Sequence, residues 1–265
     1  MEIGKPNNIK ANSFNINLSE EYHLSVQIGL KNISYYIINI NTRNVEYFKK
    51  IATDKEIINA DEILKLNFTY SSIVFVNFPF TLIPNELFIE KDSKELLEMT
   101  NDVYDIIKSD KINEIDAHLI YSIPDEINDL VFTFFPNSKQ YAQQSILIKQ
   151  FKELDNKDDN AYLYINDNVL NIFVLKNQKL IFNNSFNFES TTDILYFTLF
   201  SFEQLKLDTE TVNLKLYGEI IKNDEIHQLL YEYIRYIDFG SKPKNLNISS
   251  EFNSIKDHQF YGLFS

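Results

Sequence analysis

The sequence predicts a mixed α/β protein of two similar halves, each a three-stranded antiparallel meander followed by alternating helices and strands. Three observations support this prediction. Short segments alternate apolar with polar residues, which is typical of strands. The same order of strands and helices occurs twice along the 265 residues. Between the two occurrences, residues 155–160 form a charged and polar run without an apolar side chain.

The first half is expected at residues 21–155, after a mobile polar arm at residues 1–20. Apolar and polar residues alternate from Leu24 to Leu30, which predicts the first strand of the meander. Strands at 33–40 and 45–51 complete the meander, and an amphipathic helix follows at 54–66. The later elements expected in this half are a strand at 73–78, a helical start at Pro84, a helix at 91–98, a strand at 117–121, and helices at 125–135 and 145–154.

The second half is expected at residues 156–265. Its first strand, 161–166, is predicted to present Tyr162, Tyr164 and Asn166 on one face and smaller apolar residues on the other. Ser190 and Asp193 predict the capped start of a helix that is apolar nearly all round. The elements expected in this half are strands at 161–166, 169–175, 180–188, 212–217 and 236–239, helices at 191–205 and 223–233, and an apolar C-terminal tail that docks back.

A doubled meander of this kind is used by the ribonuclease H-like and actin-like ATPase folds. Particular segments make the resemblance more specific: FTLIPNELF (80–88), FVLKNQKL (173–180), NSF (184–186), LYF (195–197), FEQL (202–205), LYGEI (216–220) and YEYIR (231–235). Together they resemble a bacterial family of uncharacterised proteins, domain of unknown function three-eight-two-two, over roughly residues 20–265. The resemblance implies an actin-like ATPase fold and no known activity.

Nucleotide binding in such a fold requires glycine at turns that approach phosphate and carboxylates that hold Mg²⁺ through water. The turn between the first two strands of the first half offers Gly29, Lys31 and Asn32, without a carboxylate. The corresponding turn in the second half offers Asp167 and Asn168, without a glycine. The turn expected to face adenosine offers Gly218 alone. With only 5 glycines in 265 residues, the sequence favours a fold that has lost the residues of ATP hydrolysis.

We therefore expect a non-catalytic scaffold or adaptor that binds another, unidentified protein, with no catalytic residue, no metal ligand and no cofactor. The alternative is a nucleotide-binding switch that holds Mg-ATP at the six turn residues. A ribonuclease H-like nuclease is a further alternative, for which Asp167, Glu189 and Asp193 are the available carboxylates. The second half carries Tyr196, Tyr231, Tyr233 and Tyr236, which either fill the core and its rim or form a partner-binding face.

Charge and composition exclude other classes of function. The net charge is −13, and Arg43 and Arg235 are the only arginines, so a nucleic-acid partner is not expected. The chain has no cysteine, which excludes disulfides and thiolate chemistry. It shows no leader and no apolar segment of about 20 residues. We expect a cytoplasmic protein without a membrane partner, and the sequence leaves its oligomeric state open.

Overall fold

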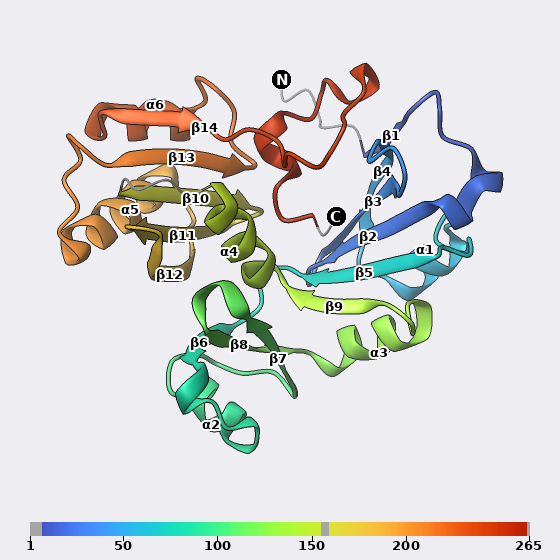
Figure 1. The fold of residues 1–265 in the computed structure, drawn as a ribbon, viewed down its shortest axis with the longest axis horizontal. Coiled ribbons are helices and arrows are strands. Elements are labelled where there is room, and N and C mark those ends of the chain that lie inside the picture. The colour runs from blue at the N-terminus through green and yellow to red at the C-terminus, as the bar shows by residue number, and fades with distance from the viewer. Residues whose placement is uncertain (1–6, 155–158, 264–265) are drawn as a thin grey trace. The chain divides into compact units, whose positions relative to one another are not determined.

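The computed structural model describes residues 7–154 and 159–263, which form two compact units (Figure 1). The first unit comprises residues 7–146, 244–255 and 262–263, and the second comprises residues 147–154, 159–243 and 256–261. The boundary expected at residues 155/156 lies outside the described residues. Within the described ranges, no helix is long and apolar enough to cross a membrane.

The first unit is built on a six-stranded sheet with the order β1-β4-β3-β2-β5-β9. Its strands are β1 (Asn8–Lys10), β2 (Tyr22–Ile28), β3 (Asn32–Asn39), β4 (Val45–Ala52), β5 (Tyr70–Phe75) and β9 (Lys139–Ala142). The pairs β2–β3 and β3–β4 are antiparallel, as the predicted meander requires. Strand β5 then runs parallel to β2, and β9 runs parallel to β5. The predicted meander is therefore confirmed, whereas β9 was not predicted.

The second unit contains a five-stranded sheet with the order β12-β11-β10-β13-β14. Its strands are β10 (Asn160–Asn166), β11 (Val169–Lys176), β12 (Lys179–Asn187), β13 (Asn213–Gly218) and β14 (Tyr236–Phe239). The first three are antiparallel, and β13 and β14 are added in parallel to β10. When its five strands are numbered by their order along the chain, they are arranged 3-2-1-4-5 across the sheet. The first sheet has the same arrangement when β1 is left out.

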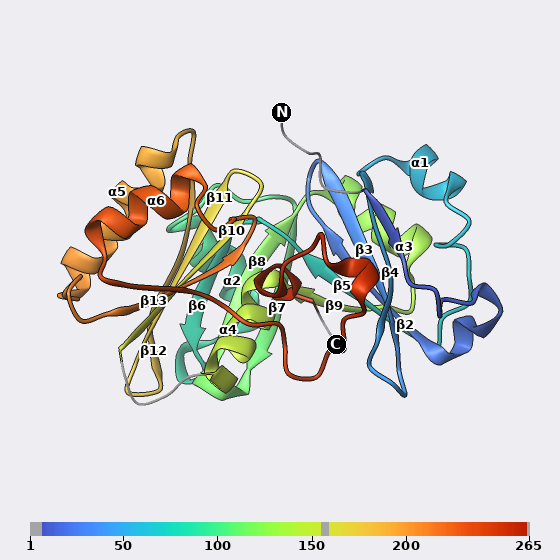
Figure 2. The same cartoon turned by 90° about the horizontal axis from the view of Figure 1, so that it is seen from above.

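Helices α5 (Thr191–Leu205) and α6 (Glu225–Tyr233) lie side by side on one face of the second sheet (Figure 2). They cover a core that includes Ala161, Leu163 and Ile165 of β10. Tyr162 and Tyr164 lie on the opposite face of β10, as the alternation predicts, and both are buried. The predicted cap of α5 is also confirmed, because Ser190 and Asp193 form a reciprocal capping box.

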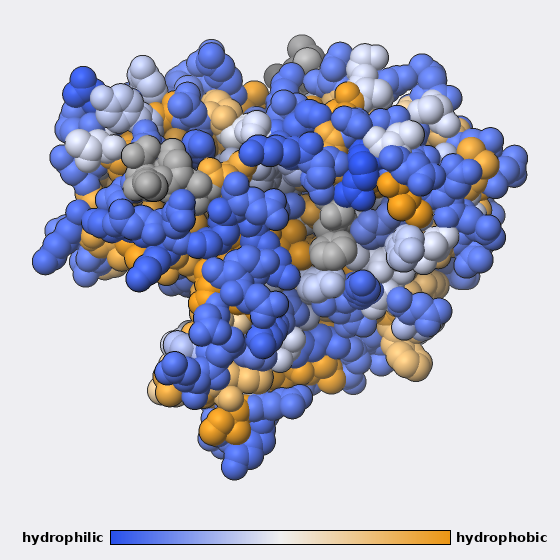
Figure 3. Space-filling model, viewed as in Figure 1, coloured by the Kyte–Doolittle hydropathy of each residue, from blue (hydrophilic) through white to orange (hydrophobic). Residues whose placement is uncertain are grey.

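A small antiparallel sheet with the order β6-β8-β7 belongs to the first unit. Its strands are β6 (Phe80–Pro84), β7 (Ile106–Ile112) and β8 (Ala117–Ile123). Helices α2 (Ser93–Glu98) and α3 (Asp125–Phe134) belong to the same unit. Pro84 ends β6 opposite Ala117, and the helical start expected there is limited to a short 3-10 turn, Asn85–Leu87, that Pro84 immediately precedes. Figure 3 shows hydrophobic residues among hydrophilic ones over this region, and Leu87, Ile89 and Met99 are exposed.

Other differences from the sequence predictions lie in the first unit, where β6 and β7 were also not predicted. Within the segment expected to be a mobile arm, Asn8–Lys10 forms β1 and pairs with β4. The helix expected at 54–66 is limited to α1 (Lys55–Ala60). It ends there because Asp61 turns inward, where its carboxylate accepts hydrogen bonds from the Tyr35 hydroxyl (2.9 Å) and the Lys49 ammonium (2.7 Å).

The last helix predicted in the first half is α4 (Gln143–Leu154), which follows β9 and continues into the residues of the second unit. In that unit its Phe151 is fully buried and stacks on Tyr162 of β10, with ring centroids 4.5 Å apart. The face of the second sheet opposite α5 and α6 is therefore covered as well.

Candidate functional site

The turn between β2 and β3 carries the first group of predicted site residues. The Gly29 amide donates to the Asn32 carbonyl (2.9 Å), and the Thr53 hydroxyl donates to the Gly29 carbonyl (2.9 Å). Asn32 begins β3, while Leu30 and Lys31 at the tip are exposed. Both backbone groups of Gly29 therefore have partners within the fold, and Lys31 is the cation that the turn presents.

Gly29 has no backbone conformation that requires glycine. Its φ lies outside the left-handed region, and a Cβ at this position would meet its nearest neighbour, the Asn32 carbonyl oxygen, at 3.5 Å. That distance is an ordinary van der Waals contact, so a residue with a side chain would fit. Gly29 was expected to bring backbone amides close to a phosphate, but the backbone at this position does not require glycine.

The turn between β10 and β11 carries the second group. Asp167 adopts a left-handed φ of 51° at the tip, and the Asn168 carbonyl accepts a hydrogen bond from the Phe188 amide (3.0 Å). The Asp167 amide donates to Oε2 of Glu219 (3.0 Å). A carboxylate of the chain itself thus occupies one of the amides that a phosphate would need at this turn.

Gly218, the last residue of β13, lies beside this turn because β10 and β13 run in parallel and pair Ile165 with Gly218. Its φ is +78°, and a Cβ would stand 2.0 Å from the Ile165 carbonyl oxygen. The next amide, that of Glu219, donates to the same oxygen (2.6 Å). Close strand packing, rather than room for a ligand, explains the glycine at this position.

The structure thus brings Asp167, Asn168 and Gly218 together in the second unit, and Gly29, Lys31 and Asn32 together in the first. It adds Glu219, which the sequence analysis did not select. Two carboxylates, those of Asp167 and Glu219, belong to the second turn, and without a bound cation their charge opposes an anionic phosphate there. Among the residues that the structure describes, no group of three or more histidine and carboxylate side chains is arranged to hold a metal ion.

A segment from near the C-terminus covers the end of β13. This segment includes a 3-10 turn, Asp257–Phe260, in which His258 is buried and its Nε2 donates to the Ile220 carbonyl (2.8 Å). The Tyr261 carbonyl accepts from the Tyr164 hydroxyl (3.3 Å). The residues just after Gly218, where adenosine was expected, therefore pack against the chain's own segment 256–261.

Aromatic rings fill the space beneath that segment. Tyr217 and Tyr261 lie with ring centroids 4.4 Å apart, and Phe151 contacts both rings. All three side chains are almost completely buried. Burial raises the pKa of Tyr261 to about 12 and raises that of Tyr217 further above its usual range. These hydroxyls stay protonated at neutral pH, and the cluster serves packing.

One of the carboxylates considered for a nuclease, that of Asp193, has local structural partners. Asp193 Oδ2 accepts from the amides of Glu189 and Ser190, at 2.9 Å each. These backbone hydrogen bonds lower the pKa of Asp193. Asp193 therefore completes the start of α5, as its position three residues after Ser190 predicts.

Several aromatic side chains of the second unit remain exposed. On α5, Tyr196 and Phe200 are 59 % and 45 % exposed and stack on one another with centroids 5.8 Å apart. Tyr231, Tyr233 and Tyr236, on and after α6, are each about half exposed or more. Exposed stacked aromatics are typical of surfaces that bind other proteins.

Comparisons with known proteins agree with this architecture. A protein-family model described as "Protein of unknown function (DUF3822)" matches residues 11–237. No curated protein matches the chain. A solved structure from Bacteroides thetaiotaomicron, described as a protein with actin-like ATPase fold and unknown function, matches with a TM-score of 0.79 and 19 % identity. That match covers 92 % of this chain and 98 % of the other.

Two further solved structures share the fold at lower identity. The PilM–PilN type IV pilus biogenesis complex matches with a TM-score of 0.60 and 11 % identity over 90 % of this chain and 95 % of the other. The cytoplasmic domain of EpsL, an inner membrane component of the type II secretion system of Vibrio cholerae, matches with a TM-score of 0.50 and 7 % identity. It covers 84 % of this chain and 92 % of that domain. The predicted actin-like ATPase fold is confirmed.

Proposed function

The chain belongs to the family described as "Protein of unknown function (DUF3822)", and from that premise we propose that it is a non-catalytic scaffold or adaptor with an actin-like ATPase fold. In this proposal it binds another protein in the cytoplasm and carries no nucleotide, metal or other cofactor.

The hydrogen bond from the Asp167 amide to the Glu219 carboxylate is the observation on which the proposal rests. A nucleotide phosphate needs unoccupied amides and nearby positive charge. At this turn the Asp167 amide is already occupied by Glu219. A phosphate that bound this amide would have to displace the Glu219 carboxylate.

Other features support the same proposal. Gly29 is not required by the backbone, and Gly218 is required by strand packing alone. Segment 256–261 packs against the residues that follow Gly218. Two neighbours of similar fold are, by their descriptions, a complex for pilus biogenesis and a component of a secretion system.

A thermal-unfolding assay with millimolar Mg-ATP, Mg-ADP or Mg²⁺ alone tests the absence of nucleotide binding. A ligand at 100 times its dissociation constant would add about 2.7 kcal/mol to the free energy of unfolding. For a chain of this size, that corresponds to a rise in Tm of about 5–11 °C. We expect no change in Tm. A Mg-dependent rise that Asp167→Asn abolishes would overturn the proposal in favour of the nucleotide-binding switch.

The partner is expected at the exposed aromatics of α5. Affinity capture with cross-linking should recover the same partner with the wild-type chain and with Phe132→Ser, and lose it with Phe200→Ser. Phe132 is a matched control because it is 77 % exposed and lies on α3 of the first unit. Equal recovery with both variants would contradict the assignment of this surface.

A further inference from the structure

A pocket of about 270 Å³ in the first unit lies away from the turns discussed above. His23 near the start of β2, Tyr70 at the start of β5 and Lys139 at the start of β9 all contribute to it. These three strands are parallel, so their first residues meet at one edge of the sheet. Gly29 follows the last residue of β2, so its turn lies at the opposite edge. The lining residues are His23, Ile40, Arg43, Phe68, Thr69, Tyr70, Ser71, Asn137 and Lys139.

The charge of this pocket is opposite to that of the protein. The chain carries a net charge of −13, yet the described residues that line the pocket include Arg43, Lys139 and His23 and no carboxylate. Arg43 is one of only two arginines in the sequence. Within residues 7–154 and 159–263, neither Arg43 nor Lys139 forms an ion pair with an acidic side chain. Two cations without anionic partners therefore face one cavity.

Hydrogen bonds fix the backbone that presents Arg43. Its amide donates to the Asn39 carbonyl (2.9 Å), and its carbonyl accepts from the Asn247 amide (2.9 Å). Its Nε donates to the Asn245 carbonyl (3.3 Å). Arg43 also has a φ of +61°, which is uncommon for a residue other than glycine. Among the described residues the guanidinium is held through Nε alone, which leaves its two terminal nitrogens for a planar anionic group.

The other walls of the pocket combine polar and aromatic groups. His23 is buried, and its Nε2 lies 2.9 Å from the Ser72 hydroxyl. Burial, with smaller contributions from Arg43 and Lys139, lowers the pKa of His23 to about 4. The imidazole is therefore neutral at pH 7, and the charges of Arg43 and Lys139 make the electrostatic potential at the imidazole more positive. Phe68 and Tyr70 supply aromatic surface to the same cavity.

We propose that this pocket binds a small organic anion in which a carboxylate or phosphate group is attached to an aromatic or apolar body. Arg43 and Lys139 bind the anionic group, and Phe68 and Tyr70 pack against the body. The volume is close to the lower end of the range for small-molecule sites, which suits a ligand of about one ring and one acidic group. This inference does not depend on the scaffold function, because none of its residues belongs to the turns of β2–β3 or β10–β11.

Calorimetric titration of the full chain at low salt tests the proposal with four probes. Phenyl phosphate and benzoate carry both an acidic group and a ring, phenol lacks the charge, and inorganic phosphate lacks the ring. We expect saturable binding of phenyl phosphate, benzoate or both, at least tenfold tighter than that of phenol or inorganic phosphate. The tighter of the two ring-bearing probes identifies the acidic group that the pocket prefers.

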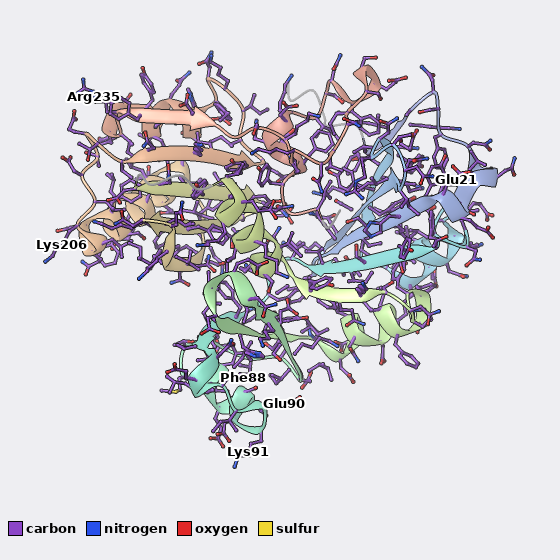
Figure 4. All side chains as sticks on the ribbon, in the orientation of Figure 1. Glu21, Phe88, Glu90, Lys91, Lys206 and Arg235 are labelled. Carbon is purple, nitrogen blue, oxygen red and sulfur yellow. The ribbon has the colours of Figure 1, made fainter. Side chains whose placement is uncertain are left out.

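Variants of the two cations locate the binding site. Arg43→Gln and Lys139→Gln should each weaken the binding at least tenfold. Arg235→Gln, the same change at the other arginine, should leave it unchanged. Arg235 is exposed between α6 and β14 in the second unit, where Figure 4 labels it. Lys139→Gln provides an independent test if Arg43→Gln disturbs its turn.

A second readout follows from His23. An anion bound beside the imidazole favours its protonated form, so NMR titration should show a higher His23 pKa with the probe than without it. The proposal is overturned if neither ring-bearing probe binds, or if Arg43→Gln and Lys139→Gln both bind as tightly as the wild type.

Discussion

Replacing Gly218 with alanine should destabilise the protein strongly. The residue has a φ of +78°, and the new Cβ would stand 2.0 Å from the Ile165 carbonyl oxygen. The left-handed conformation costs an alanine about 1–2 kcal/mol. Relief of the clash must also separate the ends of β10 and β13, which weakens the hydrogen bond from the Glu219 amide to Ile165. Loss of one or two such bonds adds about 1–2 kcal/mol.

The expected decrease in the free energy of unfolding is therefore about 3 kcal/mol, or about 6–12 °C in Tm for a chain of this size. Urea unfolding followed by circular dichroism measures it. Gly29→Ala is the matched control, because its Cβ would meet no atom closer than 3.5 Å and its φ is not left-handed. We expect that variant to stay within about 1 kcal/mol of the wild type. Equal losses for the two variants would refute the reasoning.

Two further predictions concern the first unit. Asp61→Ala should lower the free energy of unfolding by about 3 kcal/mol, because it leaves the buried Tyr35 hydroxyl and the Lys49 ammonium without their acceptor. The control is Glu62→Ala, which removes an exposed ion pair. In the same urea assay it should change the free energy of unfolding by less than about 0.5 kcal/mol. Burial lowers the pKa of His23 from 6.5 to about 4, so the unfolded chain binds more protons than the folded chain between these pH values. The free energy of unfolding should therefore fall as the pH decreases from 6.5 to 4. His23→Gln should reduce this fall by up to about 3 kcal/mol, and an unchanged pH profile would contradict the burial argument.

Local patterns in the sequence predicted much of the fold. Alternation assigned the two faces of β10, and the Ser190–Asp193 spacing located the start of α5, because both signals act over a few residues. The helix expected at 54–66 is shorter because Asp61 is drawn inward by Tyr35, which is 26 residues away. Strand β9 was missed because four residues give too little alternation for a prediction.

The candidate site was less predictable for a similar reason. The turn residues Asp167 and Gly218 could be selected from their types and positions alone. The role of Glu219 depends on the parallel register of β10 and β13, which joins residues 52 positions apart. The anion pocket draws on residues from His23 to Lys139, and its one signal in the sequence is the scarcity of arginine.

The path of the chain through the two units affects how the protein is synthesised. Residues 244–255 and 262–263 belong to the first unit, although its other described residues end at 146. At about 5–20 residues per second, a ribosome needs about 6–23 s to add residues 147–263. During that interval the nascent first unit lacks Asn247, which bonds Arg43 and Val45, and Gly262, which accepts from Gln27. The second unit likewise lacks Tyr261. Each unit therefore completes its packing only after residues 256–263 have been synthesised.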